Sequence, residues 1–243
     1  MKVVSMHQPA YLPWLGYFHR VMLSDIFVFL DTVQFEKNSF TNRNKILTDN
    51  GSLWLTVPVG IKGHTKKRLS DIEISPDSGW KKKHIQSIRQ NYAKAPYFEV
   101  FFADIEKIIA NAGHSFCDFI FTMTAYFFKV MGISTPMVRS SSLPVEGVKS
   151  DLVKNICIAL SADVYISGTL GKGYLDTHTF AKEQIRIIFQ EYRHPVYPQL
   201  FEGFQPGMCI VDLLMNKGAE EATSIIMSGN LSRQEIKESV YAS

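Results

Sequence analysis

Residues 3–31 read VVSMHQPAYLPWLGYFHRVMLSDIFVFLD, and this stretch decides the fold class. Residues 3–6 form a short apolar run typical of a buried strand, and residues 15–23 carry apolar side chains at helical spacing. Residues 25–30 are a second apolar run. Strand, helix and strand in this order predict a parallel α/β unit, in which ligands bind in the loops that follow the strands.

The rest of the chain continues this alternation after an interruption. Two strands and three helices interrupt it, at residues 41–47, 52–59, 79–92, 97–112 and 114–131. Later strands are predicted at 136–140, 162–167 and 185–192, and later helices at 150–160 and 210–217, the last ending at Gly218. The sequence therefore predicts a single α/β domain over residues 1–243 with a mostly parallel sheet. Residues 79–131 are predicted to be a helical insert or lid.

The composition is that of a globular protein and excludes disorder, because 46% of the 243 residues are hydrophobic and 12% are aromatic. Polar residues interrupt the apolar stretch 116–131, so no membrane span is predicted. The N-terminus lacks the pattern of a secretory signal. Cys117, Cys157 and Cys209 lie among apolar neighbours, which indicates reduced core thiols. These features predict a cytoplasmic protein.

Positive charge is concentrated in one segment of the chain. Nine Lys or Arg lie between Lys62 and Lys94 against three acidic residues, a local net charge of +6, whereas the whole chain carries +3. Such a segment either attracts an anionic ligand or forms a solvated helix face and loop. No nucleic-acid-binding motif accompanies it, so no nucleic-acid partner is predicted.

The first group of candidate site residues follows the first strand. His7 and His19 are candidate acid–base catalysts, because imidazole titrates near neutrality, and Gln8 and Tyr11 are candidate substrate ligands. Backbone N–H groups at the start of the next helix can hold a phosphate. The alternative is a proline-stiffened turn in which His7 is a hydrogen-bonded structural residue and His19 faces solvent.

The second group begins where the second strand ends. Asp31 is the third candidate catalytic residue, and Arg43 has the planar fork of donors that suits a carboxylate or phosphate. The other candidate substrate ligands are Gln34, Asn42 and Asn44. The alternative is that Arg43 and Lys45 form the solvated side of an edge strand.

The third group follows the strand at 162–167. Its members, Ser167, Gly168, Lys172, Tyr174 and Asp176, predict a nest for a phosphate or carboxylate, although a flexible turn is the alternative. The spacing fits neither a P-loop nor a dinucleotide-binding motif. His194 and Tyr197, in a later proline-rich loop, complete the candidate ligands. No metal site is predicted, because paired cysteines and an HExxH motif are missing from the sequence.

The sequence resembles the WbqC-like family of bacterial proteins along nearly the whole chain. The motifs that carry the resemblance are HQP at 7–9, YLPWLGYFH at 11–19, SDIFVFLD at 24–31, VQF at 33–35, NRN at 42–44, SG at 167–168, Gly171, YLD at 174–176, HP at 194–195, Tyr197, Gln199 and DLL at 212–214. Such families customarily have a serine shortly before the last of these motifs, where this chain has Cys209. The resemblance implies a role among proteins that make O-antigen or other surface polysaccharides.

A weaker similarity, at the level of the fold, is to the nucleotidylyltransferases and to ligases that form amides through an adenylate. The opening strand, the proline-rich loop and the helix start at residues 15–19 carry it, and it implies a Rossmann-like core. Those enzymes use a close pair of histidines at the helix start, whereas this chain has Tyr17 at the nearer place and His19 two residues later. The use of ATP and Mg²⁺ is therefore left open.

Three functions are compatible with these features. The leading hypothesis is an enzyme that joins an acyl or aminoacyl donor to a nucleotide-linked amino sugar through an amide, with His7 as base and Arg43 or Lys172 holding anions. The second is Mg²⁺-dependent nucleotidyl transfer, in which Asp31 or Asp176 helps to hold the metal. The third is a non-catalytic protein that binds a sugar nucleotide. The sequence leaves the donor, the sugar and the oligomeric state open.

Overall fold

A five-stranded sheet forms the centre of the computed structural model, which describes residues 1–36, 39–60, 67–76 and 79–241. The strands are β1 (Val3–His7), β2 (Ile26–Phe29), β5 (Met137–Arg139), β6 (Val164–Gly168) and β7 (Arg186–Gln190). Their order is β5-β2-β1-β6-β7, and all four pairings are parallel. The predicted α/β class with a mostly parallel sheet is therefore confirmed. Lys62, Lys66 and Asp77, which belong to the positively charged segment, lie outside the described residues.

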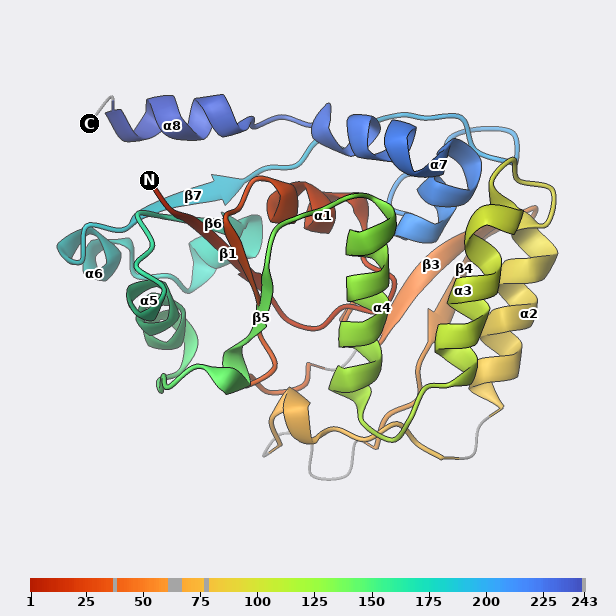
Figure 1. Ribbon diagram of the computed structural model, residues 1–243, viewed down its shortest axis with the longest axis horizontal. Coiled ribbons are helices and arrows are strands. Elements are labelled where there is room, and N and C mark those ends of the chain that lie inside the picture. The colour runs from red at the N-terminus through yellow and green to blue at the C-terminus, as the bar shows by residue number, and fades with distance from the viewer. Residues whose placement is uncertain (37–38, 61–66, 77–78, 242–243) are drawn as a thin grey trace.

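Helices cover both faces of this sheet, as Figure 1 shows. Side chains alternate along a strand, so Val4 and Met6 pack with α5 (Lys149–Ala159) and α6 (Thr177–Lys182) on one face. Val3 packs on the other face, with the C-terminal α8 (Arg233–Tyr241). The helix α1 (Leu15–Met22) covers that second face too, through the main aromatic core. His7, two pleats beyond Val3, therefore points towards α1.

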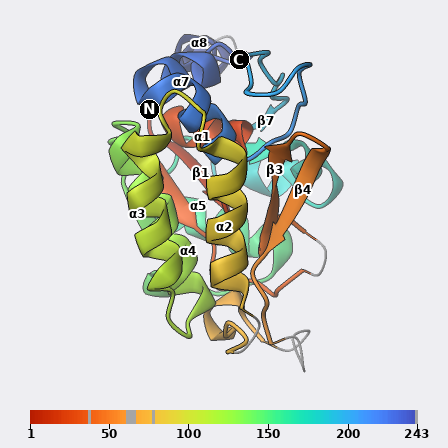
Figure 2. The same ribbon diagram turned by 90° about the vertical axis from the view of Figure 1, so that its right-hand side faces the viewer.

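The segment between β2 and β5 builds the other half of the molecule. It contains the hairpin of β3 (Arg43–Thr48) and β4 (Gly51–Thr56), followed by α2 (Trp80–Tyr92), α3 (Phe98–Ala110) and α4 (Phe116–Val130). Figure 2 shows the three helices side by side, with the hairpin next to α2. On α4, Phe128 contacts both Phe18 of α1 and Phe27 of β2, so this helix is part of the main core. An insert or lid over residues 79–131 stays a prediction.

The helix predicted at residues 210–217 ends at Gly218 as expected, and a second helical segment follows the kink there. The helix α7 runs from Ile210 to Met227, with a local break at Gly218, where φ is +73°. The ring of Tyr97 lies against this glycine, and a Cβ added there would come within 2.7 Å of the ring. Glycine therefore fits both the left-handed backbone and the close approach.

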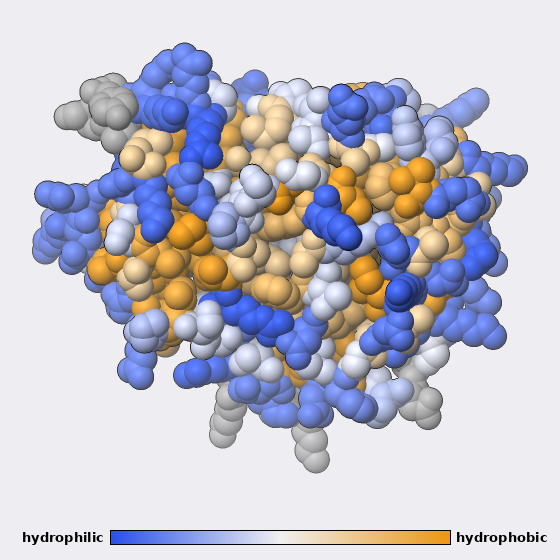
Figure 3. All heavy atoms as spheres, in the orientation of Figure 1, coloured by the Kyte–Doolittle hydropathy of each residue, from blue (hydrophilic) through white to orange (hydrophobic). Residues whose placement is uncertain are grey.

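The structure also contains several short elements that are not among the predicted ones. Among the described residues these are α6, α8 and the 3₁₀ segments η2 (Leu69–Asp71), η3 (Ser140–Ser142) and η4 (Thr169–Gly173). None of the described helices is both long and apolar enough to cross a lipid bilayer. On the face shown in Figure 3, apolar side chains gather over α5, with charged side chains around them.

Candidate functional site

The carboxyl ends of the parallel strands bring together residues from the first and third predicted groups. His7 ends β1, and its Cα pairs with that of Phe29 in β2. On its other side β1 pairs with β6 up to Ser5 and Ile166, and this register, continued by two residues, places His7 beside Gly168. Since neighbouring strands lie about 4.8 Å apart, His7 and Gly168 share one edge of the sheet, which we call the carboxyl edge.

His7 presents a neutral, half-buried imidazole at the carboxyl edge. Its Nδ1–H donates to the carbonyl oxygen of Gln8 over 2.7 Å, which leaves the lone pair on Nε2. The rings of Trp14 and Tyr17 meet the imidazole edge to face, at centroid distances of 5.1 and 5.4 Å. Burial, reinforced by the charge of Arg20, lowers the pKa of His7 to about 4. His7 is therefore uncharged near pH 7 and can accept a proton at Nε2.

A buried arginine that the sequence analysis did not single out lies next to His7. Arg20, on α1, is only 7% exposed, and its Nε donates to Oε1 of Gln190 over 3.0 Å. Within the described parts of the chain no carboxylate pairs with Arg20, and its two terminal nitrogens donate no hydrogen bond yet reach the solvent. Burial lowers the pKa of Arg20, but a guanidinium stays charged in proteins. Burying an unpaired charge costs several kcal/mol.

Gln190, at the end of β7, fixes the position of this arginine. Its Oε1 accepts from Arg20, so its Nε2 must be the donor to Nδ1 of His19 at 2.7 Å and to the carbonyl oxygen of Gly16 at 3.2 Å. His19 is fully buried, with its ring 5.0 Å from that of Tyr192. The structure thus places His19 behind the carboxyl edge, where it orients Gln190. Its predicted catalytic role stays a prediction.

The backbone of Gly168 lies against the guanidinium of Arg20, and three tyrosines lie in its neighbourhood. A Cβ added to Gly168 would lie 3.0 Å from Nη2 of Arg20, so glycine leaves room for the charged group. The hydroxyls of Tyr17, Tyr165 and Tyr174 are near enough to affect the pKa of Arg20. Tyr174, one of the predicted ligands, is 47% exposed and therefore reaches the solvent beside the arginine.

Asp31 lies at the end of β2, inside the protein and not in an open site. Its side chain is fully buried. Oδ1 accepts hydrogen bonds from Oγ of Ser140 and the N–H of Ser141, both at 2.9 Å, and Oδ2 accepts from Oγ of Ser141 at 2.7 Å. Both oxygens of the carboxylate thus accept hydrogen bonds, three in all, from donors of η3. This arrangement ties the end of β2 to the segment that follows β5.

The predicted asparagines of β3 bind backbone groups instead of facing solvent. Asn42 donates from Nδ2 to the carbonyl oxygen of Val57 over 2.8 Å. Asn44 donates to the carbonyl oxygen of Leu12 over 2.7 Å, where Leu12 has a φ of +45°. The two side chains therefore hold the hairpin to the loop after β1. This use of both amide groups favours a structural role.

The charged side chains of β3 gather around an exposed tryptophan. The guanidinium of Arg43 lies 4.5 Å and the Lys45 ammonium 5.3 Å from the ring centroid of Trp54, which is 42% exposed. Phe40 links this ring to Trp14, at centroid distances of 5.8 and 5.4 Å. A row of aromatic rings therefore connects the hairpin to the carboxyl edge, because Trp14 contacts His7.

Other predicted ligands of the first two groups have separate positions. The side-chain oxygen of Gln8 accepts a hydrogen bond from the hydroxyl of Thr41 at 3.4 Å. Gln34 is exposed, and its backbone forms an isolated antiparallel β-bridge with Arg68. Tyr11 is fully buried, with its hydroxyl 2.9 Å from Nδ1 of His84. Gln8 therefore lies next to His7, whereas the hydroxyl of Tyr11 is directed into the core.

The third predicted group begins within the last residues of β6 and runs to Asp176. Some of its residues lie at the carboxyl edge and others on the protein surface. Ser167 is 2% exposed and packs against Gly171, where a Cβ would lie only 2.1 Å from the Ser167 Oγ. Lys172 pairs with Glu191 on the surface. Asp176 caps α6 by accepting from the N–H groups of the next turn at 3.1 and 3.4 Å. In this segment, Gly168 and Tyr174 are the residues that the structure brings to Arg20.

His194 and Tyr197 belong to a buried network around a carboxylate of α7. Asp212 accepts from the hydroxyls of Tyr92 and Tyr197, both at 2.8 Å, and from Nε2 of Gln199 at 2.9 Å. Burial raises the pKa of this carboxyl group. His194 stacks on the ring of Tyr197, and burial lowers its pKa. The network fixes the loop between β7 and α7 to α2 and α7, and a role of His194 and Tyr197 in ligand binding stays a prediction.

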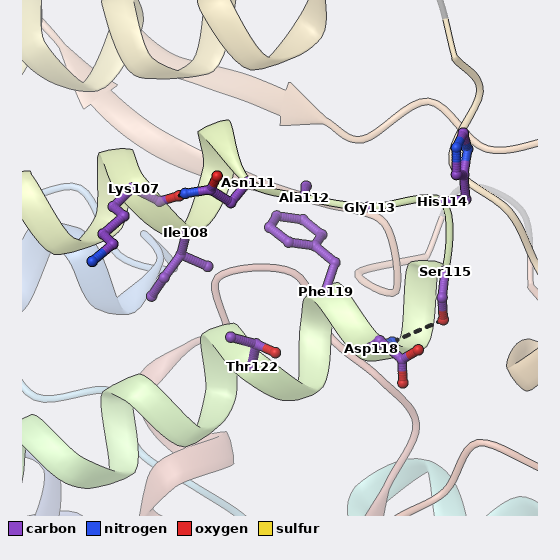
Figure 4. A pocket seen from close by; sticks show the side chains of 10 residues that line it. All are labelled: Lys107, Ile108, Asn111, Ala112, Gly113, His114, Ser115, Asp118, Phe119 and Thr122. Carbon is purple, nitrogen blue, oxygen red and sulfur yellow. Dashed lines mark hydrogen bonds between the residues drawn. The ribbon is translucent and has the colours of Figure 1, made fainter.

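Two hollows on the surface are lined by other residues. The first, of about 470 Å³, is lined by the ends of α3 and α4, including Lys107, His114 and Asp118, which Figure 4 shows from close by. The second, of about 480 Å³, lies between β4 and α2 and is lined by Trp54, Lys83 and other residues. Neither lining includes a predicted site residue. In the described parts of the chain, His, Cys, Asp and Glu form no group of three that could hold a metal ion.

Buried neutral histidines should make the fold sensitive to acid. Burial lowers the pKa values of His19 and His84 to about 4, below the ordinary 6.5. As the pH falls below 6.5 the unfolded chain takes up these protons and the folded chain does not, so stability falls until the pH reaches about 4. We expect each histidine to reduce the free energy of unfolding by about 2 kcal/mol between pH 7 and pH 5.

Urea unfolding at the two pH values measures this effect. The substitution His84→Gln removes one titrating group and should reduce the difference between pH 7 and pH 5. An unchanged difference in that variant would show that His84 is protonated equally in both states.

Comparison with known proteins agrees with the family resemblance of the motifs. Residues 8–224 match the WbqC-like protein family, and the chain belongs to this family. It is 32% identical to an uncharacterized protein, Rv1507c, of Mycobacterium tuberculosis. The alignment extends over 222 residues and covers 90% of this chain and 96% of that protein. No solved structure matches the chain.

Proposed function

We propose that this protein is an enzyme that forms an amide between an acyl or aminoacyl donor and a nucleotide-linked amino sugar, in the synthesis of a bacterial surface polysaccharide. The observation that carries the proposal is the neutral His7 at the carboxyl edge, with a free lone pair on Nε2, beside the charged Arg20. An amine attacks an acyl carbon through its lone pair, and the nitrogen must then lose a proton, which His7 can take. Membership of the WbqC-like family supports the setting in polysaccharide synthesis.

The strand order supports this edge as the place of reaction. From β1 the chain moves to β2 and β5 on one side, and then crosses back to β6 and β7 on the other. In open parallel sheets ligands bind where the order reverses, outside the carboxyl ends of the strands. Here that point lies between β1 and β6, between His7 and Gly168. The same order supports the proposed Rossmann-like character of the core.

The proposed reaction needs only a base, an anion-binding group and an activated donor. As the new C–N bond forms, the amine proton passes to Nε2 of His7, and the donor's leaving group, such as a thiolate, departs and takes up a proton. An anionic substrate bound beside His7 would raise its pKa towards neutrality and make it a stronger base. Arg43, near the row of aromatic rings, is a further proposed substrate ligand.

Nucleotidyl transfer with Mg²⁺ receives less support from the geometry. Its two candidate metal ligands have other hydrogen-bonding partners: Asp31 accepts from three donors of η3, and Asp176 caps α6. We therefore retain the amide-forming reaction as the proposed function. Ser167, Lys172, His194 and Tyr197 are not needed for it at the carboxyl edge.

Mass spectrometry of reaction mixtures tests the proposal. The purified chain is incubated with nucleoside-diphosphate amino sugars and either acyl thioesters or amino acids with ATP. We expect a product heavier than the sugar nucleotide by the acyl group. Pyrophosphate release without an acylated sugar would instead indicate nucleotidyl transfer, and tight calorimetric binding without any turnover would indicate a binding protein.

A further inference from the structure

Arg20 is a charged group for which the described fold supplies no counter-charge. Only 7% of its surface is exposed to solvent. The one hydrogen bond of its side chain within the described residues is donated by Nε to the neutral amide of Gln190. Buried charges in proteins are ordinarily paired. Both terminal nitrogens remain without an acceptor among the described residues, and both reach the solvent at the carboxyl edge.

The surroundings hold this guanidinium in place. Gln190 is itself held by hydrogen bonds to His19 and to the carbonyl oxygen of Gly16. Gln190 therefore fixes the orientation of the Arg20 side chain. In front, the missing side chain of Gly168 leaves the space next to Nη2 open. A guanidinium whose Nε is occupied presents its two terminal nitrogens as a pair of donors, the geometry that binds two oxygens of one oxyanion.

We propose that Arg20 binds a phosphate group of the substrate at the carboxyl edge, and that Gln190 is the residue that positions it. This inference rests on the proposed function, because a nucleotide-linked sugar brings a diphosphate to the same edge. Binding a phosphate supplies the counter-charge that Arg20 lacks. The half-exposed Tyr174 adds a hydroxyl donor nearby. Amide formation at His7 and phosphate binding at Arg20 are measured by different experiments, so the two ideas can fail separately.

Binding of inorganic diphosphate to the full chain, measured by calorimetry and by thermal unfolding, tests the proposal without turnover. We expect diphosphate to raise the melting temperature of the wild type. Arg20→Met should weaken binding by about tenfold or more and should remove that rise. Arg89→Met is the matched control, since Arg89 is exposed on α2 and pairs with Glu106. It should bind diphosphate as the wild type does.

The stability of Arg20→Met without ligand separates a ligand-binding arginine from a structural one. Removing an unpaired buried charge should leave the melting temperature unchanged or raise it. A large fall, together with no response of the wild type to diphosphate, would show that Arg20 serves the fold and would overturn the proposal. Diphosphate binding that is equal in Arg20→Met and wild type would overturn it too, because the anion would then bind elsewhere.

Gln190→Glu tests the site without deleting the arginine. The new carboxylate would pair with Arg20 and compete with the phosphate, so we expect diphosphate binding to be lost while the chain stays folded. A fully retained affinity in this variant would contradict the role of Gln190. Comparing UDP, UMP and uridine then identifies the group that is bound: affinity that depends on the phosphates supports the proposal, and equal affinity for uridine opposes it.

Discussion

His7→Ala is expected to lower the rate of amide formation by about 10²- to 10⁴-fold, the range for the loss of an acid–base group. The reason is that Nε2 of His7 carries the free lone pair at the carboxyl edge, while Nδ1 is held by the carbonyl oxygen of Gln8. The rate is measured by mass spectrometry of the acylated sugar nucleotide. Circular dichroism and thermal unfolding check that the variant is folded.

The pH dependence and a control variant make this prediction specific. In the free protein burial and Arg20 hold the pKa of His7 near 4, so the His7-dependent fall in kcat/KM of the wild type, which reports the free enzyme, should occur well below pH 6.5. His178→Ala removes an exposed histidine on α6 and should leave the rate unchanged. A His7→Ala variant that keeps its activity but unfolds at a much lower temperature would make His7 a structural residue.

The strands and long helices could be predicted because the residues that they bury recur along the sequence in runs or at helical spacing. The β1 and β2 strands are apolar runs, since parallel strands are covered on both faces, and α1, α2, α3 and α4 carry their apolar residues at helical spacing. The missed α8 has its own local signal. Ser232 and Glu235 form a capping box, with the N–H of each residue bound by the other's side chain. A search for this pattern would have found the helix.

The position of polar side chains was harder to predict, because it depends on tertiary neighbours. Arg20 follows His19 on a short helix, and an arginine there is typical of a solvated surface. Only the packing of α1 against the ends of β1, β6 and β7 buries it beside Gln190. Conversely, Asn42 and Asn44 belong to a polar run typical of a ligand site, but they donate to backbone carbonyl groups. The sequence shows the donors, and not which acceptors they meet.

Asp31→Ala is expected to lower the free energy of unfolding by about 3–5 kcal/mol. The carboxylate is fully buried and accepts three hydrogen bonds from Ser140 and Ser141, so its removal leaves three donors inside the protein without their acceptor. It also frees the end of β2 from the segment after β5. Urea unfolding measures the change, with the midpoint reporting stability and the slope reporting the surface that becomes exposed.

Asp176→Ala is the matched control, because both carboxylates belong to the predicted site but only one is buried. Asp176 is exposed and caps α6, so its loss should cost only about 1 kcal/mol. If Asp31→Ala keeps wild-type stability and loses activity, Asp31 takes part in the reaction as the sequence predicts. If it loses stability as expected, the polar residue at the end of β2 joins two parallel strands, and the chemistry at the carboxyl edge belongs to His7 on the neighbouring strand.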